Sequence, residues 1–138
     1  MVITDTGFWL ALANWYDRHH ESAKARLGDL GEPLITTWPV VTETCYLLLA
    51  RLGDHSQRAF LASFKAGTFE IFQLGCDHVL RIVALMKRYA NLLMDLADAS
   101  LVLLAEELGH GRILSTDQRD FGTYRWKQHE PFENLLLL

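Results

Sequence analysis

The sequence predicts an α/β fold in which a parallel sheet carries helices on both faces. Short apolar runs rich in β-branched residues alternate along the chain with longer segments of helical periodicity, and strands that are joined through helices pair in parallel. The 138 residues contain no internal repeat, low-complexity linker or shift in composition, and 50% of them are hydrophobic. This length and composition are typical of a single domain with a sizeable core.

Four strands are expected from short runs that end at an acid or a turn. Residues 2–5 are an apolar run that ends at Asp5, residues 34–38 are apolar and β-branched, residues 68–74 alternate, and residues 112–115 end before Asp117. Such runs are typical of strands that are buried in a sheet. The apolar tail, residues 132–138, is expected to add an edge strand, so that the sheet has four or five strands.

Six helices are expected from the spacing of apolar residues and from the turn residues at their ends. They cover residues 6–16, 17–30, 39–52, 56–65, 77–89 and 96–108. Pro39 suits a first helical turn, and Asp54 is expected to cap the helix that follows it. The helix over residues 96–108 has almost no polar face, which predicts burial on most sides. The buried side of the helix over residues 77–89 is expected to consist of Val79, Ile82, Val83, Met86 and Tyr89.

Charge and cysteine content exclude several classes of protein. The net charge of −4 and the pI of about 5.8 are unlike the basic footprint of a dedicated DNA-binding domain, but they do not exclude an enzyme that acts on nucleic acid. No signal peptide or membrane-spanning run is expected. Cys45 and Cys76 are isolated, which argues against a zinc ribbon or a disulfide framework and suits a reducing cytoplasm.

Six acidic residues are expected at one edge of the sheet, where the parallel strands end. They are Asp5, Glu43, Asp95, Asp98, Asp117 and Asp120. The first ends a strand, the second lies in the first turns of the helix after the second strand, and the others begin the buried helix or follow the fourth strand. Open α/β folds bind their ligands at the carboxyl ends of the strands, so this edge is the candidate site.

Each acid also has a purely structural explanation. Asp5 could cap the first helix, Glu43 could be a solvated helix residue, Asp95 and Asp98 resemble a capping pair, and Asp117 could form an Asx-turn. Asp98 is the hardest to explain in this way, because a carboxylate beside a buried helix is costly unless it is paired, hydrogen-bonded or bound to a metal. The joint pattern therefore favours a site.

Crowded carboxylates repel one another, and a divalent cation relieves that repulsion. Magnesium and manganese prefer oxygen ligands, and Mg²⁺ keeps several of its waters. One or two such ions can activate a water and stabilise the charge that develops on a phosphodiester. Since no Ser/His/Asp set or phosphate-binding glycine loop is evident, hydrolysis by metal-bound water is the chemistry that these residues best support.

Four motifs in order resemble the PIN domain, and within that family the VapC-type toxin ribonucleases of bacterial toxin–antitoxin systems. They are Asp5 in an apolar strand, Glu43 in Thr-x-Glu, Asp98 in Leu-Ala-Asp-Ala-Ser-Leu-Val and Asp117 in Leu-Ser-Thr-Asp-x-x-x-Phe. The resemblance covers essentially all of residues 1–138. It implies a three-layer α/β/α fold, cleavage of single-stranded RNA with Mg²⁺ or Mn²⁺, a homodimer, and an antitoxin that inserts a segment near the site.

The resemblance also implies roles for single residues. Asp5, Glu43, Asp98 and Asp117 correspond to the family's metal-binding, catalytic acids. Thr6 and Thr116 match small hydroxyl positions beside two of those acids. Asp95, one turn before the core aspartate, is either an accessory acid or a helix cap, and Asp120 is interpreted as a helix cap in Asp-x-x-Asp-Phe.

An RNA substrate would need cations and stacking surfaces around the site. The candidate cations are Arg18, Arg119, Arg125 and Lys127, although each one taken singly is better explained as ordinary surface charge. Trp9, Trp15 and Trp38 could stack on bases, but the first two are spaced for one helix face and fit a core or a partner-binding surface as well.

Other readings of the sequence are weaker. Asp5-Thr6-Gly7 matches the aspartic-protease signature, but that fold is almost entirely β, whereas this chain is expected to be largely helical. A haloacid-dehalogenase phosphatase would need an aspartate at position 7, and the histidines lack zinc-site spacing. The remaining alternative is a catalytically inactive PIN-like module that binds RNA or protein. The complete set of four acids argues against such decay.

Overall fold

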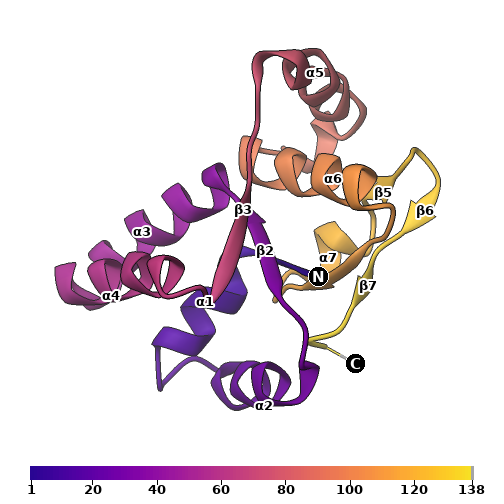
Figure 1. The fold of residues 1–138 in the computed structure, drawn as a ribbon. Helices are drawn as coiled ribbons and strands as arrows, with labels where there is room; N and C mark the ends of the chain where they lie inside the picture. The colour runs from indigo at the N-terminus through magenta and orange to yellow at the C-terminus, as the bar shows by residue number, and fades with distance from the viewer. Residues whose placement is uncertain (138) are drawn as a thin grey trace.

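A five-stranded, wholly parallel sheet forms the centre of the computed structural model, which describes residues 1–137 (Figure 1). The strand order is β3-β2-β1-β4-β7, and β1 pairs with both β2 and β4 through Ile3, opposite Ile35 and Ile113. The strands are β1 (Val2–Thr4), β2 (Leu34–Thr37), β3 (Phe69–Phe72), β4 (Arg112–Leu114) and β7 (Glu133–Asn134). The predicted parallel sheet and its edge strand from the tail are confirmed, except for residue 138, which lies outside the described residues.

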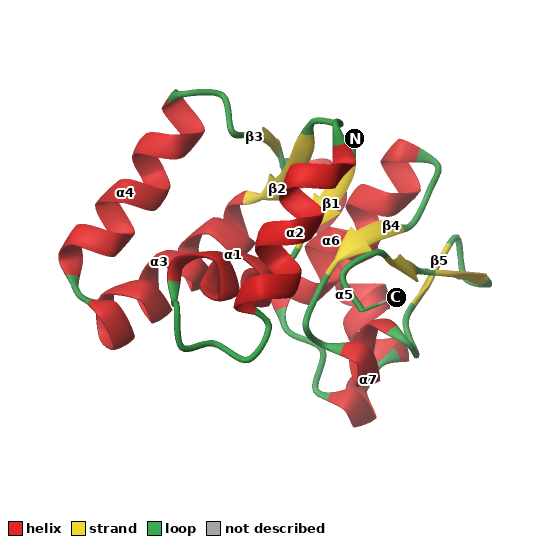
Figure 2. Cartoon of the chain, turned by 90° about the horizontal axis from the view of Figure 1, so that it is seen from below, coloured by secondary structure: helices red, strands yellow, loops and turns green. Residues whose placement is uncertain are grey.

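Helices cover the two faces of this sheet, as the sequence predicts (Figures 1 and 2). Helix α6 packs against β1 and β2 with α5 beside it, and α2 lies on the opposite side of the sheet next to α1. The α-helices are α1 (Thr6–Ala13), α2 (His20–Leu30), α3 (Trp38–Leu52), α4 (Asp54–Lys65), α5 (Val79–Arg88), α6 (Leu96–Leu108) and α7 (Gln118–Phe121). Two short 3₁₀ turns, η1 (Cys76–His78) and η2 (Ala90–Leu92), flank α5.

The expectation that α6 is buried on most sides is correct. Its buried residues are Ala97, Ala99, Ser100, Leu101, Val102, Leu103, Leu104 and Ala105. The Ser100 hydroxyl lies 2.6 Å from that of Thr37 at the end of β2, so the polar group inside this helix is satisfied. Burial of α6 fixes the start of the helix, where Asp98 lies, against the sheet.

Helix α1 ends earlier than the sequence predicts, at Ala13 instead of residue 16. The Asn14 side chain accepts a hydrogen bond from the backbone N–H of Tyr16, and such a local bond competes with helix continuation. Trp15 and Tyr16 therefore lie outside the helix and are 78% and 92% exposed. A core position for Trp15 is thus wrong.

Two further local predictions are corrected. Gly53 precedes α4, and Asp54 lies inside the first turn, where its carboxylate accepts from Gln57 and Arg58 instead of capping the helix. In α5 the buried side chains are Ile82 and Leu85. Val79 and Val83, which were expected on the buried side, are exposed. Apolar residues occupy two neighbouring faces of this helix, so helical periodicity alone does not show which face is buried.

A short antiparallel hairpin, β5 (Arg125–Trp126) and β6 (Glu130–Pro131), follows α7 and was not expected from the sequence. Its two-residue strands are too short for a periodicity signal. Within residues 1–137, no helix has both the length and the hydropathy that crossing a bilayer requires.

Candidate functional site

All six predicted acids line one cavity at the carboxyl ends of β1, β2 and β4. The cavity has a volume of about 350 Å³ and its walls come from α1, α3, α6, α7 and the loops that precede the last two. Its lining residues are Asp5, Thr6, Gly7, Leu10, Glu43, Leu47, Leu93, Asp95, Asp98, Thr116, Asp117 and Asp120. The structure thus brings together the acids that the sequence spreads over more than a hundred positions.

Asp5 is the most enclosed of these carboxylates. Only 7% of the residue is exposed, and its two oxygens accept hydrogen bonds from the Thr6 backbone N–H at 2.7 Å and the Ser115 hydroxyl at 2.9 Å. Burial raises the pKa of Asp5 to about 6; the two hydrogen bonds oppose that rise, and the charges of Glu43 and Asp117 add to it. Asp5 does cap α1, and it also faces the cavity.

Asp98 lies in the first turn of α6 and accepts a hydrogen bond from the Tyr124 hydroxyl at 2.8 Å. Burial raises the pKa of Asp98 to about 7, against the effect of that hydrogen bond, and the nearby acids Asp95, Asp5 and Asp117 raise it further. The same burial, together with the bond to Asp98, raises the pKa of Tyr124. Tyr124 therefore remains a hydrogen-bond donor to this carboxylate.

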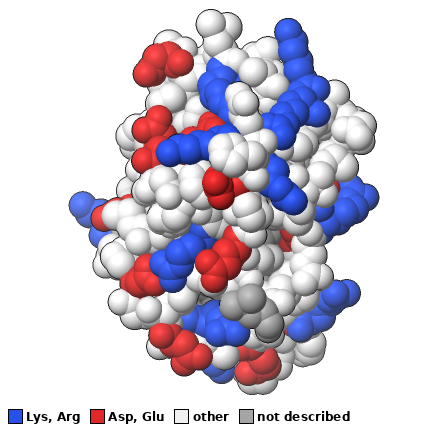
Figure 3. All heavy atoms as spheres, turned by 90° about the vertical axis from the view of Figure 1, so that its right-hand side faces the viewer, with Lys and Arg blue, Asp and Glu red and all other residues white. Residues whose placement is uncertain are grey.

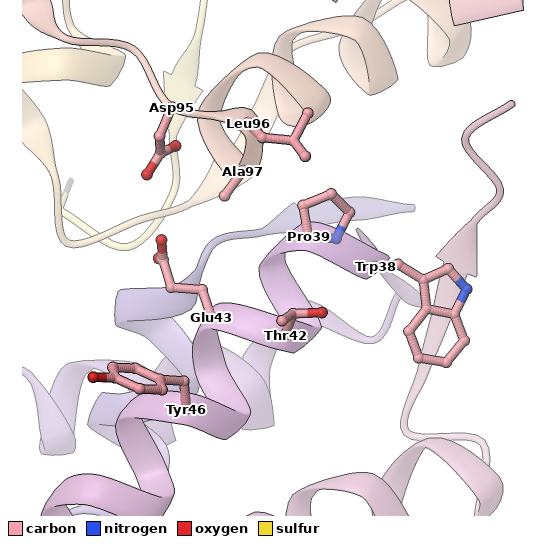
Figure 4. Close-up of a pocket in the computed structure, with 8 residues that line it drawn as sticks. All are labelled: Trp38, Pro39, Thr42, Glu43, Tyr46, Asp95, Leu96 and Ala97. Atoms are coloured by element: carbon pink, nitrogen blue, oxygen red, sulfur yellow. The ribbon is translucent and has the colours of Figure 1, made fainter. Parts of the chain in front are cut away.

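Asp95 is a helix cap that also lines the cavity, and its role as an accessory acid stays a prediction. It is the N-cap of α6, because its Oδ1 accepts from the backbone N–H of Asp98 at 2.9 Å. It also lines the cavity, with the Glu43 side chain pointing toward it from α3 (Figure 4). Burial raises the pKa of Glu43, and the adjacent Asp95 adds to the rise.

Asp117, and not Asp120, caps the short helix α7. The Asp117 carboxylate accepts from the backbone N–H of Asp120 at 2.9 Å, and its own N–H donates to the Ser115 hydroxyl at 3.0 Å. The interpretation of Asp120 as the cap is therefore wrong by one turn. Partial burial raises the pKa of Asp117; the hydrogen bond from the backbone N–H of Asp120 opposes that rise, and the Asp120 side chain adds to it.

The two threonines beside these acids also line the cavity. The Thr6 hydroxyl is buried and makes no hydrogen bond within residues 1–137, although it lies near the Glu43 carboxyl. Thr116 lies against the backbone of α1, where a Cβ added to Gly7 would fall 1.9 Å from its Oγ1. Glycine at position 7 thus allows the loop after β4 to approach α1 closely.

The donor set of this cavity fits a hydrated divalent cation. Within residues 1–137 no three His, Cys, Asp or Glu side chains converge closely enough to enclose a bare ion. Nevertheless four carboxyls have raised pKa values, partly through one another's charge, and the buried Thr6 hydroxyl lacks a partner. An oxygen-only set of this kind suits Mg²⁺ or Mn²⁺, since Mg²⁺ is commonly held through its waters.

The four predicted RNA-binding cations do not line the cavity. Arg18 donates to His19, and Arg119 pairs with Asp120 in the cavity wall. Arg125 donates to backbone carbonyl oxygens, and the Lys127 ammonium lies over Trp126. Their role toward RNA stays a prediction.

The tryptophans divide between core and surface. Trp9 is buried and donates to Thr4, so a stacking role for Trp9 is wrong. Trp38 is half-exposed and lines a second, mainly apolar cavity of about 580 Å³, which adjoins the acidic one through Glu43 and Asp95 (Figure 4).

Sequence reasoning missed Ser115, Tyr124 and Leu93. Ser115 bonds to Asp5 and Asp117, and Tyr124 bonds to Asp98. Leu93, in a left-handed conformation with φ of 55°, lines the cavity before Asp95. Ser115 stands beside the predicted Thr116-Asp117 pair and could have been suspected; nothing local marks Tyr124 or Leu93.

A parallel α/β sheet with acids at its carboxyl edge is the arrangement of a PIN domain, and the sequence profile of the PIN domain matches residues 2–127. The chain therefore belongs to the PIN domain family. It is similar to the ribonuclease VapC26 of Mycobacterium tuberculosis, with 26% identity over 124 residues, which cover 90% of this chain and 92% of VapC26.

The fold also matches a solved structure, that of VapC20 of Mycobacterium tuberculosis, described as a toxin that cleaves the sarcin–ricin loop. The TM-score is 0.80 at 22% identity, and the match covers 86% of this chain and 92% of VapC20. At this identity the match establishes the three-layer fold, which the sequence had predicted.

Proposed function

We propose that this chain is a divalent-metal-dependent endoribonuclease, the toxin of a toxin–antitoxin pair, which cleaves single-stranded or loop RNA. The observation that carries the proposal is the cavity in which six acids meet at the carboxyl edge of the sheet. Membership of the PIN domain family and the similarity to ribonuclease VapC26 support the same reaction class.

In this proposal Asp5, Glu43, Asp98 and Asp117 hold Mg²⁺ or Mn²⁺. The bound cation would supply an activated water and charge stabilisation at the scissile phosphate. Ser115 and Tyr124 donate hydrogen bonds to Asp5 and Asp98, so they orient these two carboxylates as outer-shell groups do at metal sites.

Three accessory residues complete the proposed site. Asp95 holds the first turn of α6, and so the backbone of Asp98, through its capping bond. The partnerless hydroxyl of Thr6 is free to bind a water or a phosphate oxygen, and Thr116 offers a second hydroxyl on the same cavity wall. Asp120 adds negative charge beside Asp117.

The proposed partners are an RNA substrate, a small antitoxin that blocks the site, and a second copy of the chain in a homodimer. The solved structure of VapC20 is described as that of a toxin that cleaves the sarcin–ricin loop, which supports an RNA loop as the class of substrate. A catalytically inactive binding module is the alternative, and it is disfavoured because the buried, crowded acids would then have no cation to relieve their repulsion.

The deciding experiment is cleavage of a mixed RNA pool by the purified protein with Mg²⁺ or Mn²⁺. Cleavage is expected to stop with EDTA and in Asp5→Asn, and to persist in Asp29→Asn, which removes an exposed acid of α2. Absence of cleavage by well-folded protein over a broad RNA pool would favour the binding module. Equal cleavage by Asp5→Asn would remove Asp5 from the site.

A further inference from the structure

Three basic residues gather at one place outside the acidic cavity. Arg88 ends α5, and Arg125 and Lys127 belong to the β5–β6 hairpin and its turn. The Arg88 guanidinium donates to the carbonyl oxygen of Gln128 at 2.6 Å, and the Arg125 backbone N–H donates to the hydroxyl of Tyr89 at 2.9 Å. In Figure 3, which views the right-hand side of Figure 1, several basic side chains lie in the upper half of the face, toward α5, with acidic side chains among them.

No carboxylate within residues 1–137 pairs with any of these three cations, although the chain has a net charge of −4. The Arg125 guanidinium donates to the carbonyl oxygens of residues 122, 123 and 124. The carboxylate of Glu106, an acid beside the hairpin, already accepts hydrogen bonds from Nε and Nη2 of Arg81 and from the backbone N–H of Lys127. The Arg88 guanidinium lies over the Tyr89 ring and the Lys127 ammonium over the Trp126 ring, so these contacts and the carbonyl bonds leave all three positive charges without a neutralising acid in the described part of the chain.

The hairpin turn is held in a conformation that its residues disfavour. Lys127 and Gln128 have φ values of 47° and 70°, a left-handed region that costs an L-residue about 1 kcal/mol and in which turns ordinarily use glycine or asparagine. Glu106 fixes the backbone of Lys127, and Arg88 fixes that of Gln128. Strained backbone that is held in place by surrounding contacts occurs often at functional sites. In this turn the Lys127 side chain is exposed to solvent.

One residue connects this surface to the acidic cavity. The Tyr124 hydroxyl donates to Asp98 at 2.8 Å, and the carbonyl oxygen of the same Tyr124 accepts from the Arg125 guanidinium at 2.9 Å. The buried Tyr124 therefore joins the hairpin to a carboxylate of the cavity through two hydrogen bonds. Lysine and arginine side chains neutralise the phosphates of a nucleic-acid backbone.

We propose that Arg88, Arg125 and Lys127 form a phosphate-binding platform on which the RNA strand continues beyond the cavity. This proposal rests on the proposed ribonuclease function, because it assigns the scissile phosphate to the acidic cavity. It also selects among the sequence-predicted cations: Arg125 and Lys127 belong to the platform with Arg88, whereas Arg119, already paired with Asp120, does not.

The test measures binding of a labelled single-stranded RNA to the full chain in EDTA, as a function of salt. For Arg88→Gln and Lys127→Gln, each lost phosphate contact is expected to lower the slope of log K against log salt by about 0.7 and to weaken binding several-fold at low salt. The matched control is Arg58→Gln, which removes an arginine of α4 that pairs with Asp54. The control is expected to bind as the wild type does.

The outcomes separate this proposal from the proposed function. An unchanged slope in both variants would overturn the platform even if the wild type cleaves RNA, and a reduced slope without any cleavage would support the platform while the ribonuclease fails. If Arg88→Gln misfolds, Lys127→Gln still provides the test. The bond to Glu106 comes from the Lys127 backbone, so the substitution does not remove it. If polyglutamate binds with the same dependence on these residues and RNA does not, the platform serves an acidic protein instead.

Discussion

At the scale of single residues, the unusual feature is a pair of carboxyl groups that the fold keeps away from water. The pKa values of about 6 for Asp5 and about 7 for Asp98 arise first from burial, and the charges of neighbouring acids raise them further. Hydrogen bonds from Ser115 and Tyr124 offset only part of that effect. Ionised at neutral pH, these two carboxyl groups destabilise the folded state, and such groups are common at active sites, where they serve ligand binding or catalysis.

Replacing Asp98 by asparagine is expected to abolish RNA cleavage and leave the fold intact. An asparagine carbonyl oxygen can still accept the bond from Tyr124, and the charge repulsion with Asp5, Asp95 and Asp117 is removed. Cleavage rate and melting temperature, measured beside Asp29→Asn, check both parts. Full activity would exclude Asp98 from the site, and a melting temperature many degrees lower would show that Asp98 is structural.

The stability of the metal-free protein should depend on pH through the same residue. Asp98 has a pKa of about 7 when folded and 3.8 as its ordinary value, so between these pH values the folded state holds a proton that the unfolded state releases. The contribution of Asp98 therefore favours folding at low pH and is lost as pH rises toward 7. This contribution of Asp98 to the free energy of unfolding is about 2 kcal/mol. That is roughly half of the value that corresponds to the whole pKa shift, because solvent screens a partly exposed carboxyl group.

The measurement is the difference in free energy of unfolding between Asp98→Asn and the wild type in EDTA. Because asparagine does not titrate, the free energy of unfolding of the variant is expected to rise relative to that of the wild type as pH rises from about 4 to about 7. A difference that stays flat across this range would contradict the raised pKa.

At the scale of elements, the site depends on how closely the start of α1 approaches the loop after β4. Gly7 lies against Thr116, and an added Cβ would meet the Thr116 Oγ1, Cβ and Cγ2 at 1.9, 3.1 and 3.3 Å. Rotation of the threonine cannot clear all three atoms. The contact lies between the two segments from which Asp5 and Asp117 line the cavity.

Gly7→Ala is accordingly expected to destabilise the protein by about 1–3 kcal/mol, the usual range for overpacking, and to reduce cleavage. Gly28→Ala in α2 is the control, because nothing lies within 4 Å of its added Cβ and alanine favours a helix. Chemical denaturation compares the two variants. Thr116→Ala combined with Gly7→Ala should recover part of the lost stability, and a lack of coupling would show that the contact is unimportant.

At the scale of the whole molecule, the end of the chain supports the carboxylate at its beginning. Edge strand β7 brings Asn134 beside Ser115, whose backbone N–H and carbonyl both bond to the asparagine side chain. The Ser115 hydroxyl then donates to Asp5. Residues 134, 115 and 5 thus form one chain of hydrogen bonds that reaches the site.

Asn134→Ala should therefore lower both stability and cleavage. The two lost bonds leave buried backbone groups of Ser115 without partners, which costs about 1–3 kcal/mol. Gln73→Ala, at an exposed position after β3, is the control. Thermal unfolding and cleavage rates are compared for both, and unchanged activity in a destabilised Asn134→Ala would limit the tail to a role in folding.

The amino-acid sequence was sufficient to predict the α/β fold, the order of the principal helices and strands, and the six acids at one edge. Each of these rests on a local signal: strand-like runs, helical spacing, and an acid where an element ends. Parallel strands share a carboxyl edge, so local positions alone bring Asp5, Glu43, Asp98 and Asp117 into one region. No comparable rule links Tyr124 to Asp98 or Asn134 to Ser115.

Which distant side chains meet, and how much water they lose, depends on how the elements pack in three dimensions. Packing selected one of two apolar faces of α5, drew the Ser115 and Tyr124 hydroxyls onto two carboxylates, and paired Arg119 while leaving Arg88 without a carboxylate partner in residues 1–137. Burial and hydrogen-bond geometry, which set the raised pKa values of Asp5 and Asp98, are properties of the assembled structure. A linear pattern encodes where a residue lies in its element, but its neighbours across the fold follow from the packing of all elements together.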